Sequence, residues 1–172
     1  MNSNASAGIR ILGSLRSADG KGVVRMEDRF DTDIDDLWSA ISDPARLARW
    51  VGEIEGDLRI GGEFRGRFFD GWEGTGRVVA CEPPRRFELL TKHPRQLDEL
   101  VVEATLTADG AQTILVLEER GMRLDQLPDY GAGIQIHVED LAAYLAGGEH
   151  CDVEARWAEL RPFYQDLAAD IR

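Results

Sequence analysis

The sequence predicts an α+β fold in which a curved antiparallel sheet wraps around a long helix near the C-terminus. Three observations support this prediction. Apolar and polar residues first alternate, as in a strand with one wet face, and apolar residues then recur every three to four positions over 34–51, as in amphipathic helices. Strand-like alternation returns over 57–120, and helical spacing resumes after Gly121. A chain of 172 residues suits one domain of ordinary size.

An opening hairpin is predicted from two short β-favouring runs, residues 9–15 and 23–30, because a Ser-Ala-Asp-Gly turn separates them. Two short helices follow. Thr32 and Asp35 resemble a capping box at the start of the first helix. Asp43-Pro44 supplies an N-cap and a first-turn proline for the second.

The middle of the chain predicts a meander of antiparallel strands. Residues 57–68 contain a Gly-Gly pair and are predicted to form two strands bent at that pair. Turns that contain Pro or Gly divide the remaining strand candidates, which are residues 74–81, 87–92, 100–107 and 113–120.

Two helical segments close the sequence. The first is predicted to be long and half-buried, and it ends at Gly147-Gly148; its apolar repeat is Ile134, Val138, Leu141 and Leu145. The second is predicted to be helical over 152–171, with a kink or a restart at Pro162. Its apolar stripe consists of Val153, Trp157, Leu160, Tyr164, Leu167 and Ile171.

A stripe of this regularity must be buried against something. The outward-facing apolar residues of the sheet offer one surface for it, and these are Val79, Val101, Ile114 and Val116. We therefore divide the chain into a disordered leader at 1–8, a single domain at 9–148 and a helical extension at 149–172. The extension packs either on its own domain or against the partner in a homodimer.

Composition excludes several classes of partner. Lys and Arg number 20 against 32 Asp and Glu, so the net charge is −12 and nucleic-acid binding is disfavoured. The longest apolar run, 141–146, is far too short to span a membrane. Cys81 and Cys151 lack CxxC or metal-ligand spacing, and two thiols in a chain of this length suit a reducing compartment better than a disulfide scaffold. We therefore expect a cytoplasmic protein with no nucleic-acid or membrane contact.

Two motifs narrow the fold further. Residues 34–50, Ile-Asp-Asp-Leu-Trp-Ser-Ala-Ile-Ser-Asp-Pro-Ala-Arg-Leu-Ala-Arg-Trp, resemble the opening helices of the START-like SRPBCC superfamily, in the branch of activators of heat-shock protein ATPase homologues. Residues 57–64, Asp-Leu-Arg-Ile-Gly-Gly-Glu-Phe, are similar to that branch's bent hairpin. The resemblance continues through 113–121 and 131–145, similar to the penultimate strand and the C-terminal helix, and covers roughly 22–147.

The resemblance implies a helix-grip fold whose sheet and C-terminal helix enclose a cavity for an apolar small molecule. Members of the superfamily include lipid and hormone binders, polyketide cyclases and aromatases, and chaperone regulators, so the fold does not imply one reaction. The leading hypothesis is a binder of a lipid, polyketide or aromatic metabolite. An enzyme of the cyclase or aromatase kind and an interaction protein of the chaperone-regulator kind are the alternatives.

Strand parity and helix spacing indicate which residues face the interior. The candidate ligand-binding residues are Phe64, Phe68, Trp72, Gly74, Gly76, Leu106, Leu115, Leu117, Ile134, Val138 and Leu141. The alternating glycines, Gly74 and Gly76, leave space that a ligand or Trp72 can occupy, and Gly76→Leu is predicted to fill it. The alternative is a closed core of ordinary density. We interpret Trp38 and Trp50 as helix-to-sheet packing.

Catalysis would require a buried ionisable group, and the candidates are Glu119 and His137. Glu119 shares strand parity with Leu115 and Leu117. Its carboxylate either projects into the cavity, where desolvation would raise the pKa, or lies in water at a frayed strand end, which the sequence favours. We therefore lean towards a protein without catalytic activity. The spacing around His137 does not match a helical metal site, and we expect no metal and no cofactor.

Overall fold

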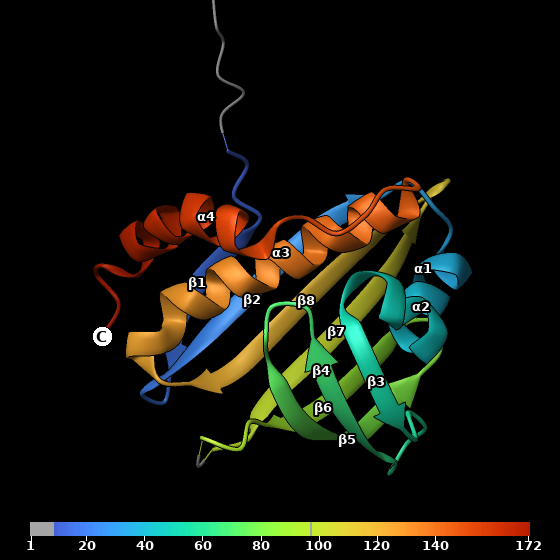
Figure 1. Cartoon of the computed structure of the whole chain (residues 1–172), viewed down its shortest axis with the longest axis horizontal. Helices are drawn as coiled ribbons and strands as arrows, with labels where there is room; N and C mark the ends of the chain where they lie inside the picture. The colour runs from blue at the N-terminus through green and yellow to red at the C-terminus, as the bar shows by residue number, and fades with distance from the viewer. Residues whose placement is uncertain (1–8, 97) are drawn as a thin grey trace, which may run out of the picture.

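Within residues 9–96 and 98–172, which the computed structural model describes, eight strands form one antiparallel sheet in the order β1-β2-β8-β7-β6-β5-β4-β3 (Figure 1). The predicted leader, 1–8, lies outside these residues. The strands are β1 Gly13–Ala18, β2 Lys21–Phe30, β3 Gly52–Gly56, β4 Glu63–Phe68, β5 Glu73–Glu82, β6 Arg86–Lys92, β7 Leu100–Asp109 and β8 Gln112–Met122. The helices are α1 Ile34–Ser42, α2 Pro44–Trp50, the 3₁₀ turn Leu124–Gln126, α3 Leu127–Leu145 and α4 Val153–Ala168.

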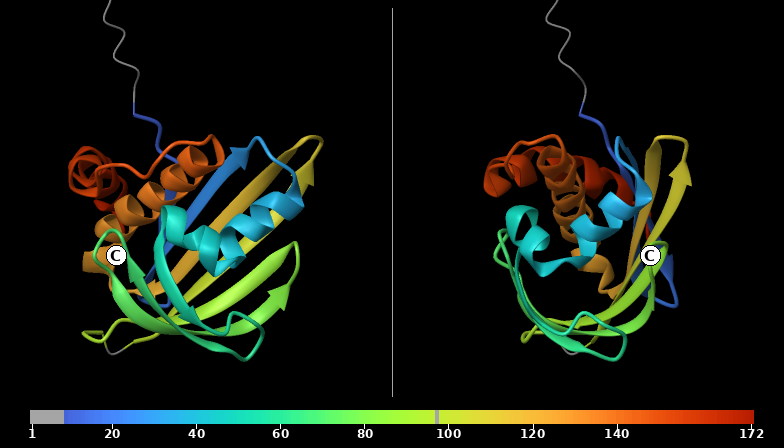
Figure 2. Two further views of the ribbon diagram at one scale, coloured as in Figure 1. Left: turned by 45° about the vertical axis from the view of Figure 1, so that its right-hand side comes forward. Right: turned by 90° about the vertical axis from the view of Figure 1, so that its right-hand side faces the viewer.

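The sheet curls into a U around α3, and α1 and α2 lie across the open side of the U (Figure 2). The main core lies between the concave face of the sheet and these helices, with α4 on the far side of α3. The α+β class and the helix wrapped by a curved antiparallel sheet are as the sequence predicts. This arrangement leaves one face of α3 turned towards the sheet, which is where the cavity described below lies.

The two short helices begin at aspartates. The side chain of Asp33 accepts a hydrogen bond from the Asp36 backbone N–H at 2.8 Å, and Asp43 caps α2 in the same way. The prediction that Thr32 caps the first helix is therefore wrong. Thr32 Oγ1 instead donates to the Asp36 carboxylate at 2.6 Å, which ties the preceding loop to the first turn.

The segment 57–62 is not a strand, which corrects the prediction of two strands within 57–68. The Asp57 side chain accepts from the Arg59 backbone N–H at 2.9 Å, a local turn that takes the segment out of the ladder. Besides β5, β4 pairs with β3, which begins at Gly52 and pairs Gly52 with Phe68. Gly52 has a φ of +146°, and a Cβ there would overlap the Arg67 carbonyl, so this strand start requires glycine.

Helix α4 packs against α3 and β1 of its own chain, and Leu160 and Tyr164 are fully buried there. The helix is unbroken through Pro162, so no second helix starts at that residue. The outward-facing sheet residues proposed as its surface stay half-exposed instead, and these are Val79, Val101, Ile114 and Val116. Helix α4 packs on α3 instead, where the absence of a side chain at Gly131 leaves room for the Tyr164 ring.

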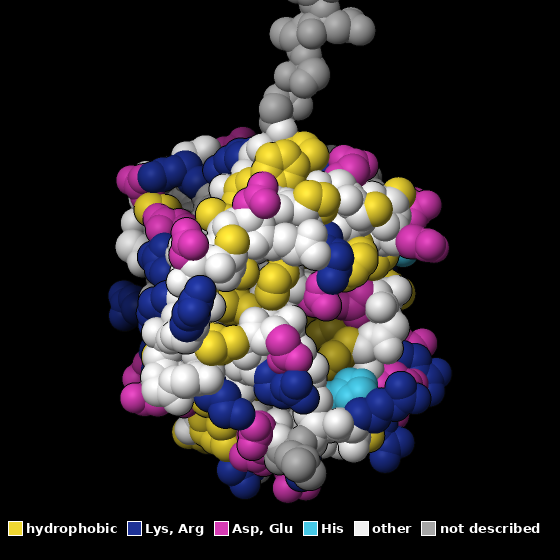
Figure 3. All heavy atoms as spheres, turned by 90° about the vertical axis from the view of Figure 1, so that its left-hand side faces the viewer, with side chains coloured by type: hydrophobic (Ala, Val, Ile, Leu, Met, Phe, Trp, Pro, Cys, Tyr) yellow, Lys and Arg dark blue, Asp and Glu magenta, His cyan; other side chains and the backbone are white. Residues whose placement is uncertain are grey.

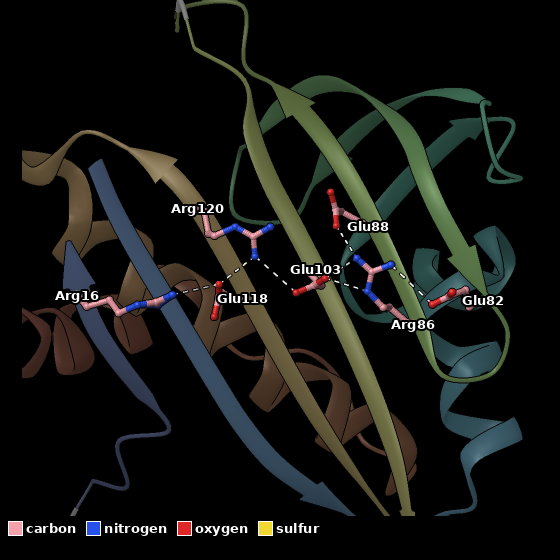
Figure 4. A network of polar contacts seen from close by, with 7 residues as sticks. All are labelled: Arg16, Glu82, Arg86, Glu88, Glu103, Glu118 and Arg120. Atoms are coloured by element: carbon pink, nitrogen blue, oxygen red, sulfur yellow. Dashed lines mark hydrogen bonds and ion pairs between the residues drawn. The ribbon is translucent and has the colours of Figure 1, made fainter. Parts of the chain in front are cut away.

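The convex face of the sheet carries a chain of ion pairs that runs from β1 to β5 (Figure 4). Glu103 on β7 accepts two hydrogen bonds from Arg86, at 2.9 and 2.6 Å, and also contacts Arg120 at 3.5 Å. The complete set is Arg16, Glu118, Arg120, Glu103, Arg86, Glu88 and Glu82. Glu118 and Glu119 are adjacent on β8, so their side chains lie on opposite faces, and Glu118 belongs to this convex network.

Candidate functional site

A cavity of about 400 Å³ lies between the concave face of the sheet, the α1–α2 pair and α3. Figure 3 shows a hollow with hydrophobic side chains inside it, on the face of the molecule where α3 begins. The volume falls within the range of small-molecule sites, roughly 300–1,000 Å³. Most of its walls are aliphatic or aromatic side chains, and its ionisable wall residues are Asp70, Cys81, Glu119, Asp129, Tyr130 and His137.

The structure brings most of the sequence-predicted site residues together in this cavity. From the sheet and its turns come Phe64, Phe68, Trp72, Leu115 and Leu117. From α3 come Ile134, Val138 and Leu141, at the helical spacing that predicted a common face. Both candidate catalytic residues, Glu119 and His137, also line the cavity.

Three predicted site residues do not reach the cavity. A Cβ at Gly76 would overlap the Phe64 ring, and one at Gly74 would meet Trp72 at 2.5 Å, so aromatic rings already fill the space over both glycines. Leu106 is 2% exposed and belongs to the packed core. The substitution Gly76→Leu would therefore displace Phe64 rather than fill the cavity, which corrects the expectation drawn from the alternating glycines.

Sequence reasoning missed the contribution of the two short helices. Trp38 and Trp50, interpreted as packing residues, line the cavity as well as packing. The Trp50 indole donates to the Ala40 carbonyl at 3.0 Å, and Trp38 meets Phe87 edge-on at 5.8 Å, so both rings are held in place. The apolar spacing of these helices could have predicted this role, because an amphipathic helix on the open side of a curved sheet must turn its apolar face inward.

Gly133 is a second wall residue that sequence reasoning missed. It lies on α3 between Tyr130 and His137, and a Cβ built there meets nothing within 4 Å. The three positions share one helix face at spacings of three and four residues. Gly133 therefore keeps part of this wall free of side chains.

Asp70 and His137 form a hydrogen-bonded pair in the cavity wall. Asp70 comes from the turn between β4 and β5, His137 comes from α3, and Oδ2 lies 3.0 Å from Nε2. Burial raises the pKa of the Asp70 carboxyl, but the hydrogen bond and charge of His137 outweigh it, so the pKa lies below its usual value. This contact joins the β4–β5 turn to the helix.

Glu119 lies on β8 with Val24 of β2 and Val102 of β7 as its cross-strand neighbours. Burial raises the pKa of its carboxyl to about 7; the charge of Asp70 adds to the increase and that of His137 opposes it. Among the residues that the structure describes, none forms a hydrogen bond with this side chain. Because β8 runs on to Met122, Glu119 lies inside the strand rather than at a frayed end, and its side chain is partly buried in the cavity wall.

Tyr130 stands beside this polar group at the start of α3. Its hydroxyl accepts a hydrogen bond from Gln96 Nε2 at 3.0 Å. Burial raises the pKa of the phenol, and the nearby Glu119 charge raises it further. Asp129, also on the wall, accepts from Arg161 of α4 at 2.8 Å. The cavity thus has a polar group of Asp70, Glu119, Tyr130 and His137 within walls that are otherwise largely apolar.

This arrangement can hold an apolar molecule and offer hydrogen-bonding partners to one part of it. A carboxyl with a pKa of about 7 can also exchange a proton near neutral pH. Over residues 9–96 and 98–172, no group of three or more His, Cys, Asp and Glu side chains is placed to hold a metal ion.

Comparison with known proteins assigns the fold. The family model described as Activator of Hsp90 ATPase homolog 1-like protein matches residues 31–146. The chain belongs to this family. The match spans both short helices, strands β3 to β8 and α3, which together form the cavity. It confirms the START-like resemblance found in the sequence, and the fold is the helix-grip fold.

Several solved structures have the same fold as this chain. CalU16 from Micromonospora echinospora is 26% identical with a TM-score of 0.75, and the similarity covers 91% of this chain and 95% of that one. DynU16, a protein in the dynemicin biosynthetic locus, is 27% identical with a TM-score of 0.70, covering 77% of this chain and 49% of that one. MLL2253 from Mesorhizobium loti is 25% identical with a TM-score of 0.66, covering 73% and 97%.

A search of curated proteins finds no significant match. No helix in the described part of the chain is both long and apolar enough to cross a membrane. Family membership supports a domain of the hydrophobic-ligand-binding type and leaves the ligand and the role to be argued from the site itself.

Proposed function

We propose that this protein binds a largely apolar small molecule, of the lipid, polyketide or aromatic kind, in the cavity between the sheet and α3. The observation that carries the proposal is a cavity of about 400 Å³ with apolar walls and one polar group. Phe68, Leu117 and Ile134 contribute apolar surface to it from three different elements. Such a combination is typical of small-molecule sites.

Packing for stability alone does not account for a cavity of this size. Apolar wall surface that stays accessible to solvent forgoes roughly 25 cal/mol of stabilisation for each Å². Gly133 leaves its part of the wall open although alanine, which has a higher helix propensity, would fit there, since a Cβ meets nothing within 4 Å. The open volume is therefore better explained by a ligand than by an inability of the chain to fill it.

Substitution of Gly133 tests the proposal. Gly133→Leu places a side chain in the cavity, whereas Gly133→Ala adds one methyl group and serves as the matched control. Both should raise thermal stability, because glycine in a helix interior is about 1 kcal/mol less favourable than alanine. Binding of Nile red, an uncharged apolar dye, should be strong in the unsubstituted protein and in Gly133→Ala, and should fall at least about tenfold in Gly133→Leu.

The outcome that counts against the proposal is equal dye binding by the unsubstituted protein and Gly133→Leu, with both variants folded. Absence of dye binding to the unsubstituted protein would count against it equally. Thermal melting of all three proteins separates loss of binding from loss of fold.

General acid–base catalysis on the bound molecule is a second candidate. The observation that favours it is the Glu119 carboxyl in the cavity, with a pKa of about 7 and the Asp70–His137 pair close by. An enzyme of the cyclase or aromatase kind would use such a group to move a proton. In an assay that reveals turnover, Glu119→Gln should then abolish most of it while Nile red binding persists; full activity in that variant would exclude this role.

A further inference from the structure

We propose that the cavity selects apolar molecules that carry a basic nitrogen, with the protonated amine placed against Glu119 beside the Asp70–His137 pair. This inference rests on the proposed function and names the class of ligand. Three features of the cavity carry it: the sign of its charges, the unpartnered state of Glu119 and the aromatic side chains around the polar group.

The charged groups of the cavity wall favour a cation. Three carboxylates line it, Asp70, Glu119 and Asp129, and among the described wall residues no Lys or Arg accompanies them. Arg161 pairs with Asp129 from outside, and His137 pairs with Asp70. If each of these two pairs has no net charge, the remaining carboxylic acid of the site is Glu119, which adds a negative charge and no positive one. A ligand carboxylate would meet repulsion there, and a ligand ammonium would meet attraction.

The Glu119 carboxylate has free hydrogen-bond acceptor positions that an ammonium group could use. An ionised carboxylate accepts hydrogen bonds and donates none, and within residues 9–96 and 98–172 no side chain or backbone group donates to this one. Its cross-strand neighbours, Val24 and Val102, are apolar. A protonated amine would supply both the missing donor and the opposite charge in an environment of low polarity, where charge-assisted hydrogen bonds are strongest.

Aromatic side chains line the same cavity as Glu119, and one of them packs against His137. Phe68 and Trp72 lie 4.7 Å apart between ring centroids, and Phe68 meets His137 edge-on at 5.4 Å. Tyr130 lies close enough to Glu119 for the carboxylate charge to raise the pKa of the phenol. Aromatic faces attract cations through their quadrupoles, and a carboxylate with aromatic neighbours is a common way to bind alkylated ammonium groups.

A matched series of naphthalenes tests the inference: 1-naphthylmethylamine, 1-naphthalenemethanol and 1-naphthoate share an apolar body and differ in the polar group. Isothermal titration calorimetry at about pH 8 should give the amine an affinity at least about tenfold above the alcohol, with the carboxylate weakest. Glu119→Gln should remove most of the preference for the amine and leave the affinity for the alcohol within about threefold.

Glu118→Gln is the control, because Glu118 occupies the next position on β8 and its side chain lies in the convex ion-pair network. This variant should bind all three naphthalenes as the unsubstituted protein does. Nile red binding and thermal melting establish that each variant is folded and keeps its cavity.

Three results would overturn the inference: naphthoate binding at least as tightly as the amine, equal affinities for amine and alcohol, or an amine preference that survives Glu119→Gln. If Nile red binds while none of the naphthalenes does, the inference fails and the proposed function stands. If Nile red also fails to bind, the proposed function and this inference fail together.

Discussion

Glu119 sits on β8 among apolar cross-strand neighbours, on the face that lines the cavity. Its pKa rises from an ordinary value of 4.5 to about 7 in the folded protein, chiefly through burial. Between these two pH values the folded state binds more protons at Glu119 than the unfolded state does. The contribution to stability is therefore fully present below about pH 4.5, and it is lost as the pH rises through about 7.

Glu119→Gln should therefore stabilise the protein in a pH-dependent way. The amide resembles the protonated carboxyl and cannot ionise, so the variant avoids the unfavourable burial of a charge. At about pH 8 the free energy of unfolding should rise by at most about 3 kcal/mol, and near pH 4 it should hardly change. Urea unfolding at the two pH values measures both numbers.

Glu118→Gln, at the neighbouring position, should show no such gain at about pH 8, because Glu118 accepts hydrogen bonds from arginines on the convex face. An equal effect of Glu119→Gln at both pH values would contradict the burial of its carboxyl. A residue that destabilises the fold under neutral conditions is typical of a functional site, where activity is retained at the expense of stability.

Helix α3 lines the cavity with one face and packs against α4 and the N-terminal segment with the other. One face lines the cavity with Tyr130, Ile134 and His137, and the opposite face carries Gly131 and Gln135 towards α4 and the N-terminal segment. The element that shapes the cavity is thus held from behind by residues outside the matched family region, 31–146.

A buried hydrogen-bond group joins these pieces. The Tyr164 hydroxyl of α4 donates to Gln135 Oε1 and accepts from the Gly13 backbone N–H at 3.1 Å. Gln135 also accepts from the Leu12 N–H at 3.1 Å and donates to the Arg10 carbonyl at 2.7 Å. Because the Gln135 and Tyr164 side chains are buried, removal of either one leaves a hydrogen-bonding group of the other without that partner in an apolar environment.

Truncation after Gly148 should therefore lower the melting temperature and promote aggregation, because it removes Leu160 and Tyr164 and exposes the back of α3. Tyr164→Phe is the milder companion variant and should lower the free energy of unfolding by about 1–3 kcal/mol. Thermal melting and static light scattering measure both effects.

An unchanged melting temperature and solubility after truncation would show that the extension is dispensable. The homodimer that the sequence analysis considered stays a prediction. Helix α4 presents Phe163 and Leu167 to solvent at 41% and 46% exposure. Conversion of a dimer to a monomer on truncation would place the interface on this helix.

Across the whole molecule, the curved sheet has two faces of opposite character. Its concave face is apolar and lines the cavity, and its convex face carries the ion-pair network of Figure 4. Glu103 is central to that network because it contacts both Arg86 and Arg120, which lie on the strands either side of it. A single half-exposed ion pair contributes little to the free energy of unfolding. Linked pairs contribute more, because they share side chains that are already ordered.

Glu103→Gln should lower the free energy of unfolding by about 0.5–1 kcal/mol at low salt, and the difference should shrink at about 1 M salt, where charges are screened. Glu73→Gln is the control, since Glu73 pairs only with the exposed Arg67 in the described chain, and its effect should be near zero. Urea unfolding at both salt concentrations measures the difference. A loss from Glu103→Gln that persists at high salt would indicate a packing effect instead.

The sequence by itself determined the elements and the faces that carry the site. Periodicity reports which side chains share a face, so the α3 repeat of Ile134, Val138 and Leu141 and the β8 parity of Leu117 and Glu119 were predictable. A turn formed by local hydrogen bonds can break such a pattern, and for that reason the strand predicted at 57–60 is absent from the described structure.

Only the tertiary structure decided what fills the interior. The Phe64 ring covers Gly76, the space over Gly133 stays open, and Asp70 reaches His137 across 67 positions of the chain. These outcomes depend on the volumes and directions of side chains from elements far apart in sequence, and periodicity carries no information about either. The pKa of Glu119 belongs here too, because desolvation is a property of everything packed around the carboxyl rather than of the strand that carries it.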